Sequence, residues 1–171
     1  MKNTQRLVKI MYWMFQLLFW LVPISAALYW TLTPGELIAS NIEAPRHFIT
    51  VDHTTRLLGG LINIVPTAVV MYSLSLLIRL FANYQRQQIF TDENTVIYRR
   101  LSYLLLGWVF LSYLYNAVMS YIFTYQAPYH IVSVIFKSSD IKTLVAAGIC
   151  IVIANVVQEG HRLALEQELT I

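Results

Sequence analysis

The sequence predicts an all-α fold, an integral membrane four-helix bundle that forms a single transmembrane domain over residues 1–171. Hydrophobic residues make up 57% of the chain and charged residues only 12%, far from the balance of a soluble domain. The apolar residues gather into four blocks of about 18 to 25 residues, and a helix of that length spans roughly 30 Å of hydrocarbon. Basic residues flank these blocks instead of clustering with aromatic residues, which argues against direct nucleic acid binding.

The first expected span covers residues 10–32 and follows Lys2, Arg6 and Lys9. A basic start before an apolar run also describes a cleaved signal peptide. This run is too long for a signal core, and Thr31–Pro34 is a poor small-residue cleavage site. We therefore expect a retained helix.

Three further spans follow from the same hydropathy pattern. They are expected at residues 57–82, 101–125 and 142–160, joined by outer loops 33–56 and 126–141 and by a cytoplasmic loop 83–100. Pro23 and Pro66 lie in the middle of the first two spans. A proline removes a backbone N–H and bends a membrane helix, so each predicts a fixed bend, with a hinge as the functional alternative.

The orientation follows from the lysines and arginines, because basic residues near a span resist translocation. On the side of the two termini they are Lys2, Arg6, Lys9, Arg79, Arg86, Arg99, Arg100 and Arg162. The opposite side holds Arg46, Arg56, Lys137 and Lys142. This bias predicts that the N-terminus, the C-terminus and loop 83–100 all lie in the cytoplasm.

Helix signals extend the third and fourth spans beyond the bilayer. Thr91 is suited to cap a helix that has Asp92 and Glu93 in its first turn, where the helix dipole favours acids. Asp140 is expected to cap the fourth helix in the same manner. The tail places opposite charges at helical spacing, at Glu159, Arg162 and Glu166. We therefore expect the third and fourth helices to extend into the cytoplasm.

A polar stripe recurs at every fourth position of the third span and should not face lipid. It consists of Ser112, Asn116, Ser120 and Thr124, and the second span adds Asn63 and Thr67 in the same outer half. Hydrogen bonds between the two helices, worth about 0.6 to 2 kcal/mol each, are the favoured interpretation. A polar pocket that opens outward is the alternative for this intramembrane polar cluster.

The sequence shows no pattern that predicts catalysis, a cofactor or a metal. Nucleophile elbows, phosphate-binding glycine loops and zinc-protease motifs are missing from it. No ionisable residue lies in the middle of a span, which argues against a pump. His47 and His53, with Asp52 and Glu43, leave a weak external metal or pH-sensing site as an alternative to simple solvation. The single cysteine, Cys150, excludes an intrachain disulfide.

Small residues in the fourth span allow another helix to approach closely. They recur at four-residue spacing, at Ala146, Cys150 and Ala154. We expect packing within the chain, with a homodimer interface as the weaker alternative.

Two segments on the expected cytoplasmic side carry a family resemblance: Gln88–Asn94, and Val157–Leu163 with its continuation Glu166–Ile171. They resemble the bacterial membrane family catalogued as domain of unknown function 2975. The resemblance implies a multi-pass protein of the bacterial inner membrane. Members of that family look like partners of small helix-turn-helix regulators of the Xre/Cro type, which implies a signalling or sequestering role.

The leading functional hypothesis is a non-enzymatic inner-membrane protein that serves as an anchored partner or sensor for a cytoplasmic regulator. The residues expected to bind the partner are Phe90, Thr91, Asp92, Glu93, Asn94, Glu159, Arg162, Glu168 and Leu169. The alternative for these residues is that they cap and dock the two projecting helices. The alternative function is a small-molecule or lipid-binding transport accessory that uses the polar cluster in the outer half of the bundle.

Overall fold

The fold is known from a computed structural model that describes residues 2–42, 44, 49, 51–125, 128, 132–134 and 137–168, the side chains of 2, 3, 161 and 163–168 excepted. Its regular elements are α1 (Lys2–Leu32), α2 (Gly35–Ser40), α3 (His53–Gln85), α4 (Asp92–Phe123) and α5 (Ser138–Glu168). Within these residues every regular element is a helix, so the all-α prediction is confirmed.

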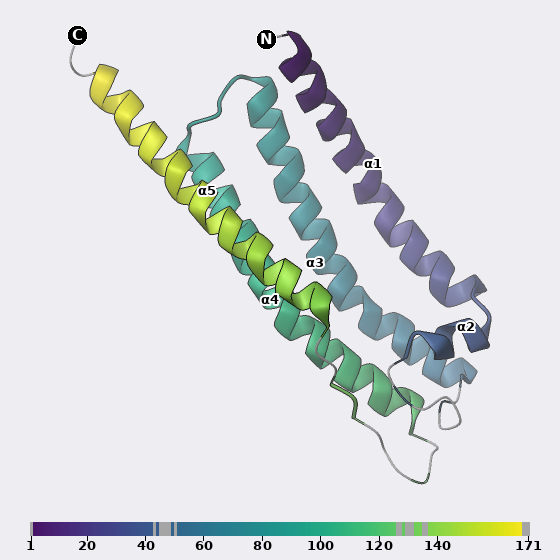
Figure 1. The fold of residues 1–171 in the computed structure, drawn as a ribbon. Helices are drawn as coiled ribbons and strands as arrows, with labels where there is room; N and C mark the ends of the chain where they lie inside the picture. The colour runs from purple at the N-terminus through teal and green to yellow at the C-terminus, as the bar shows by residue number, and fades with distance from the viewer. Residues whose placement is uncertain are drawn as a thin grey trace.

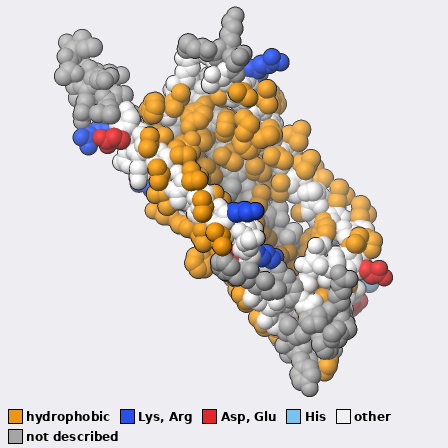
Figure 2. Space-filling model, in the orientation of Figure 1, with side chains coloured by type: hydrophobic (Ala, Val, Ile, Leu, Met, Phe, Trp, Pro, Cys, Tyr) orange, Lys and Arg blue, Asp and Glu red, His pale blue; other side chains and the backbone are white. Residues whose placement is uncertain are grey.

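Four of the helices described, α1, α3, α4 and α5, are long and apolar enough to cross a membrane. Each corresponds to one of the expected spans, except that α4 ends at Phe123, whereas its span was expected to reach residue 125. Large hydrophobic side chains cover their outer faces, among them Leu17, Phe110 and Val152, each more than 60% exposed (Figure 2). A soluble monomer rarely exposes apolar surface on this scale, so the faces fit contact with lipid.

Each long helix packs mainly on the next long helix in the chain: α1 packs on α3, α3 on α4 and α4 on α5. Both termini and the α3–α4 connection lie at one end of the bundle, which we call the terminus end (Figure 1). Helix α2 and the α4–α5 connection lie at the other, which we call the α2 end. This arrangement is the one expected of four antiparallel spans.

Helix α2 lies in a segment expected to be a loop. Pro34 and Gly35 are ordinary loop signals, but Pro34 has φ −56° and precedes the first helical residue, a place that its ring favours. The helix is held by one buried side chain, Ile38, which packs with Trp30 and Met119. Tertiary contact therefore stabilises a helix of six residues that local sequence does not predict.

Two clusters of buried side chains hold the bundle. At the α2 end they are Trp30, Ile38, Met119 and Phe123, and towards the terminus end they are Leu76, Leu80, Ile97 and Leu101. The second cluster needs the extra turns of α4, which starts at Asp92, before the apolar span expected from residue 101. Helix α5 similarly starts at Ser138 and continues to Glu168, so both helices are longer than the apolar spans they contain.

At the α2 end of the bundle, side chains form hydrogen bonds with backbone groups at the helix termini. Asp52 and Thr55 form a reciprocal capping box at the start of α3. Arg56 donates from Nη2 to the Thr33 carbonyl at 2.6 Å, at the C-terminus of α1, where the dipole favours a cation. Asp140 accepts from the backbone N–H of Lys137 at 2.9 Å, so it stabilises the start of α5 as expected, although from the third helical residue.

The small residues of α5 pack inside the chain. Ala147 and Ala154 are fully buried, whereas Ala146 and Cys150 are half-buried. Gly148 has no atom near the position that a Cβ would take, so it lies on an open face. The buried face thus includes Ala154 of the expected stripe, together with Ala147 from beside it.

Candidate functional site

The end of α3 reverses the chain through an unusual residue. Gln87 has φ 62°, in the left-handed region that glycine occupies most easily. The N–H of Gln88 donates to the Asn83 carbonyl at 3.0 Å, and the N–H of Gln87 donates to the Tyr84 carbonyl at 3.1 Å. These two bonds are the Schellman pattern that closes a helix and directs the chain back toward it.

A buried amide then fixes the α3–α4 connection. Asn94 donates from Nδ2 to the carbonyls of Gln88 and Ile89, at 2.7 and 2.8 Å. Its Oδ1 accepts from Nδ2 of Asn83 at 2.9 Å, and Asn83 also donates to Glu93 at 3.1 Å. Asn94 is fully buried, and both polar atoms of its side chain are paired, as burial requires. We call this set of hydrogen bonds the Asn94 latch.

Thr91 caps α4 as the sequence predicts. Its backbone is extended, with φ −135° and ψ 152°, and its Oγ1 accepts from the N–H of Asn94 at 3.3 Å. Asp92 and Glu93 occupy the first turn. The cap and the hydrogen bonds of Asn94 together stabilise the conformation of this connection.

The α3–α4 connection also contacts α5. The ring of Phe90 lies against Gly160, where an added Cβ would stand 2.7 Å from Cδ1 of the ring. Two residues earlier on α5, Gln158 accepts from Nη2 of Arg99 at 3.1 Å. The two segments with the family resemblance are therefore joined into one surface, which we call the Phe90–Gly160 surface.

The expected partner-binding residues separate into two groups. Asn94 is buried and Thr91 half-buried, so these two support the surface from inside, as the capping alternative expected. Those exposed at the surface are Phe90, Asp92, Glu93, Glu159 and Arg162. The Glu159–Arg162 pair is long, at 3.9 Å, and open to solvent. The side chain of Glu168, and Leu169, lie outside the described residues.

Three contributors to this surface were missed from sequence. Ile89 is 47% exposed beside Phe90, and its place within the family-like segment was a signal that could have found it. Arg99 and Gln158 are joined only by the packing of α4 on α5, which no local pattern predicts.

Within the intramembrane polar cluster, one hydrogen bond joins α3 to α4. Oδ1 of Asn63 on α3 accepts from the hydroxyl of Tyr115 on α4 at 3.2 Å. Thr67 donates to the Asn63 carbonyl of its own helix at 2.7 Å. A hydrogen bond across the α3–α4 interface was expected, but its α4 partner is a tyrosine outside the predicted stripe.

The hydroxyl groups of the polar stripe on α4 donate hydrogen bonds to backbone carbonyls of their own helix. Ser112 donates to its own helix at Val109, Ser120 to Ala117 and Thr124 to Ser120. Ser120 also accepts from the N–H of Ser133 at 2.9 Å, which fastens the α4–α5 connection. Asn116 lines a separate cavity of about 60 Å³ near α2. The expected cluster therefore does not converge on one pocket.

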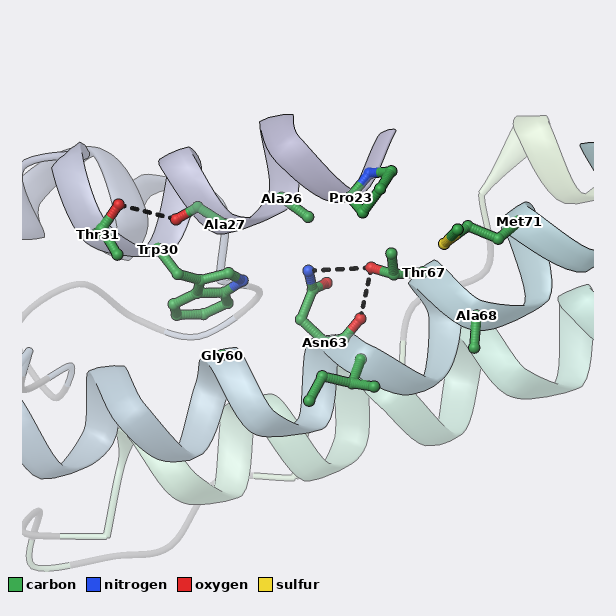
Figure 3. A pocket seen from close by; sticks show the side chains of 11 residues that line it. Pro23, Ala26, Ala27, Trp30, Thr31, Gly60, Asn63, Thr67, Ala68 and Met71 are labelled. Carbon is green, nitrogen blue, oxygen red and sulfur yellow. Dashed lines mark hydrogen bonds between the residues drawn. The ribbon is translucent and has the colours of Figure 1, made fainter. Parts of the chain in front are cut away.

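A larger groove separates α1 from α3 and has a volume of about 430 Å³ (Figure 3). It is lined by Pro23, Ala26, Ala27, Trp30, Thr31, Gly60, Asn63, Ile64, Thr67, Ala68 and Met71. Asn63 and Thr67 point into it from α3. Sequence reasoning placed these two residues toward α4 and did not predict the groove.

In the part of the chain that the structure describes, no three His, Cys, Asp or Glu side chains come together as metal ligands would. Glu43 and His47, which belong to the weak external site considered from sequence, lie outside that part. The structure therefore does not test that alternative.

Comparison with known proteins agrees with the resemblance carried by Gln88–Asn94 and the end of α5. No curated protein and no solved structure matches the chain. Residues 9–171 match the family described as Protein of unknown function (DUF2975). With four membrane-capable helices and a match over nearly its whole length, the chain belongs to the DUF2975 family.

Proposed function

We propose that this protein is a non-enzymatic protein of the bacterial inner membrane that binds a small cytoplasmic helix-turn-helix regulator through its Phe90–Gly160 surface. The sensor or anchoring role implied by the family resemblance is part of this proposal. Three features support it: the distribution of charge, the rigidity of the connection, and the exposed apolar side chains that it presents.

The charged residues of α3 indicate where the helix leaves the membrane. Residues 57–78 lie between Arg56 and Arg79 and span about 33 Å at about 1.5 Å per residue, close to the roughly 30 Å of a hydrocarbon core. The α3–α4 connection follows Arg79 and is surrounded by exposed basic residues. They are Arg86, Arg99 and Arg100. This excess of basic residues favours the cytoplasm for the terminus end.

The observation that carries the proposal is the contact of Phe90 with Gly160. It brings the loop and α5 together and leaves Phe90 51% exposed and Ile89 47% exposed among charged neighbours. Apolar side chains held outside a bilayer favour burial against another protein. Since Asn94 and Thr91 fix the backbone beneath them, little conformational entropy is lost when a partner binds.

Site-specific photocrosslinking tests the proposal in living cells. A photoreactive amino acid is placed at Ile89, with Leu37 on α2 as the control, because both side chains are about half-exposed but lie at opposite ends. We expect a cross-link from position 89 to a soluble helix-turn-helix protein and none from position 37. No cross-link to such a protein, or the same products from both positions, would count against the proposal.

A matched pair of substitutions tests the surface itself. Ile89→Glu should abolish co-purification of the regulator with the intact membrane protein, whereas Leu37→Glu should leave it unchanged. Both side chains are exposed, so neither change buries a charge. Equal recovery of the regulator with both variants would show that the Phe90–Gly160 surface is not the binding site.

A further inference from the structure

The groove between α1 and α3 has the dimensions of a ligand site. Its volume of about 430 Å³ falls within the roughly 300 to 1,000 Å³ of small-molecule pockets. Ala26 on α1 and Gly60 and Ala68 on α3 leave the space open, and Trp30 and Met71 lie toward its two ends (Figure 3). The groove is therefore a short apolar slot within the membrane spans.

A hydrogen-bond donor points into this slot. The side-chain amide of Asn63 has two N–H groups. Its Nδ2 reaches Thr67 Oγ1 at 3.5 Å, beyond the usual range for a hydrogen bond, and the Thr67 hydroxyl already donates to the Asn63 carbonyl at 2.7 Å. The Asn63 amide thus retains the capacity to donate to an acceptor in the groove, even though its Oδ1 is engaged by Tyr115.

The depth of Asn63 restricts what that acceptor can be. If Arg56 marks the edge of the hydrocarbon, Asn63 lies about 10 Å below it and Thr67 lies near the middle of the core. A phospholipid keeps its charged headgroup at the membrane surface, because a charge in the hydrocarbon is costly. The acceptor at Asn63 must therefore belong to an uncharged molecule that dissolves in the core of the bilayer.

We propose that the α1–α3 groove binds a lipid-soluble quinone, with a ring carbonyl accepting a hydrogen bond from the Asn63 amide. A quinone is uncharged, carries carbonyl acceptors on a flat ring and has an apolar tail that suits the small-residue slot. The indole of Trp30 supplies an aromatic wall for such a ring. The inference concerns binding alone and is independent of the Phe90–Gly160 surface, which lies at the terminus end.

Competitive photolabelling of the full chain in phospholipid vesicles tests this. A photoreactive azidoquinone is the probe, and decylubiquinone and dodecylbenzene are the competitors, since the second has the apolar body but no carbonyl. We expect labelling on α1 and α3 around Ala26 and Ala68, displaced by decylubiquinone and not by dodecylbenzene. Equal displacement by both competitors, or labelling spread over the lipid-facing sides of all helices, overturns the proposal.

Three variants separate a ligand site from helix packing. Ala68→Phe fills the slot from an exposed position and should abolish the displaceable label. Asn63→Leu should raise the half-maximal concentration of decylubiquinone about threefold to tenfold, the effect of one hydrogen bond. Asn116→Leu, which removes an amide that lines a different cavity, should leave that concentration unchanged.

The remaining outcomes are also decisive. If Asn63→Leu does not fold, the comparison of the two competitors on the unmodified protein still tests the need for a carbonyl. If the purified protein retains one phospholipid that Ala68→Phe loses, the groove binds a phospholipid and the quinone proposal is wrong.

Discussion

The ring of Phe90 lies over the backbone of Gly160 so closely that a Cβ added to Gly160 would stand 2.7 Å from Cδ1 and 2.9 Å from Cε1. Glycine at this position therefore admits the ring, and the ring joins the α3–α4 connection to α5. Because both residues belong to the segments that carry the family resemblance, their contact gives those segments a shared structural role.

This contact predicts a coupling between two substitutions. Gly160→Ala should stabilise the helix by about 1 kcal/mol in a Phe90→Ala background, where alanine's better helix propensity acts alone. In the presence of Phe90 the clash should remove that gain, for a coupling energy of at least about 1 kcal/mol. Unfolding of the four single and double variants in mixed micelles measures it, and additive free energies would mean that the ring does not rest on Gly160.

The Asn94 latch predicts a destabilisation that helix capping alone would not give. Asn94→Asp keeps an acceptor for Asn83 and places an acid in the first turn of α4, where the dipole favours it. It also sets a carboxylate against the Gln88 and Ile89 carbonyls, which lose their donor. We expect the free energy of unfolding to fall by about 2 to 3 kcal/mol. An unchanged free energy of unfolding would mean that Asn94 does not stabilise the α3–α4 connection through the Gln88 and Ile89 carbonyls.

The left-handed backbone at Gln87 predicts a stabilising change. Gln87→Gly should raise the free energy of unfolding by about 0.5 to 1 kcal/mol, since glycine adopts φ 62° without the steric cost of a Cβ. Gln88→Gly is the matched control and should lower stability through backbone entropy. Thermal melts of the two variants that move in the same direction would contradict the Schellman geometry.

Two adjacent glycines of α3 are predicted to behave oppositely. An added Cβ at Gly59 would stand 2.5 Å from Cη2 of Trp30 and 3.1 Å from Cε2 of Phe123, whereas at Gly60 the nearest atom is 3.6 Å away. Gly59→Ala should cost about 1 to 3 kcal/mol by overpacking. Gly60→Ala should be neutral or stabilise by up to about 1 kcal/mol. Similar unfolding free energies for both would refute this packing.

The sequence was sufficient for the features that depend on composition and local chemistry. Blocks of apolar residues predict the four long helices, and the Thr91 cap with its acidic first turn predicts that α4 starts before its apolar span. Helix α2 was not predictable, because Ile38 is helical through its burial against Trp30 and Met119. Hydropathy alone likewise could not show how far α4 and α5 extend beyond their apolar blocks.

The candidate site was predictable only as a pair of segments. Their residues were named, but which ones are buried depends on side-chain contacts between segments far apart in the chain. Asn94 reads as a polar surface residue in sequence, and only its bonds to Asn83, Gln88 and Ile89 show it to be internal. Tyr115 was not predicted, because in sequence it is one more aromatic residue of an apolar span. Only the structure shows that its hydroxyl donates to Asn63.

The proposed binding surface requires that the α3–α4 connection and the C-terminal end of α5 lie together on the cytoplasmic side of the membrane. Cysteine accessibility in intact cells tests this directly, with single cysteines in a Cys150→Ser background that removes the native thiol. Gln87→Cys and Arg162→Cys should react with a membrane-impermeant maleimide only after the cells are opened, whereas Ser40→Cys in α2 should react in intact cells. Labelling of positions 87 and 162 on opposite sides would contradict both the topology and the proposed binding surface.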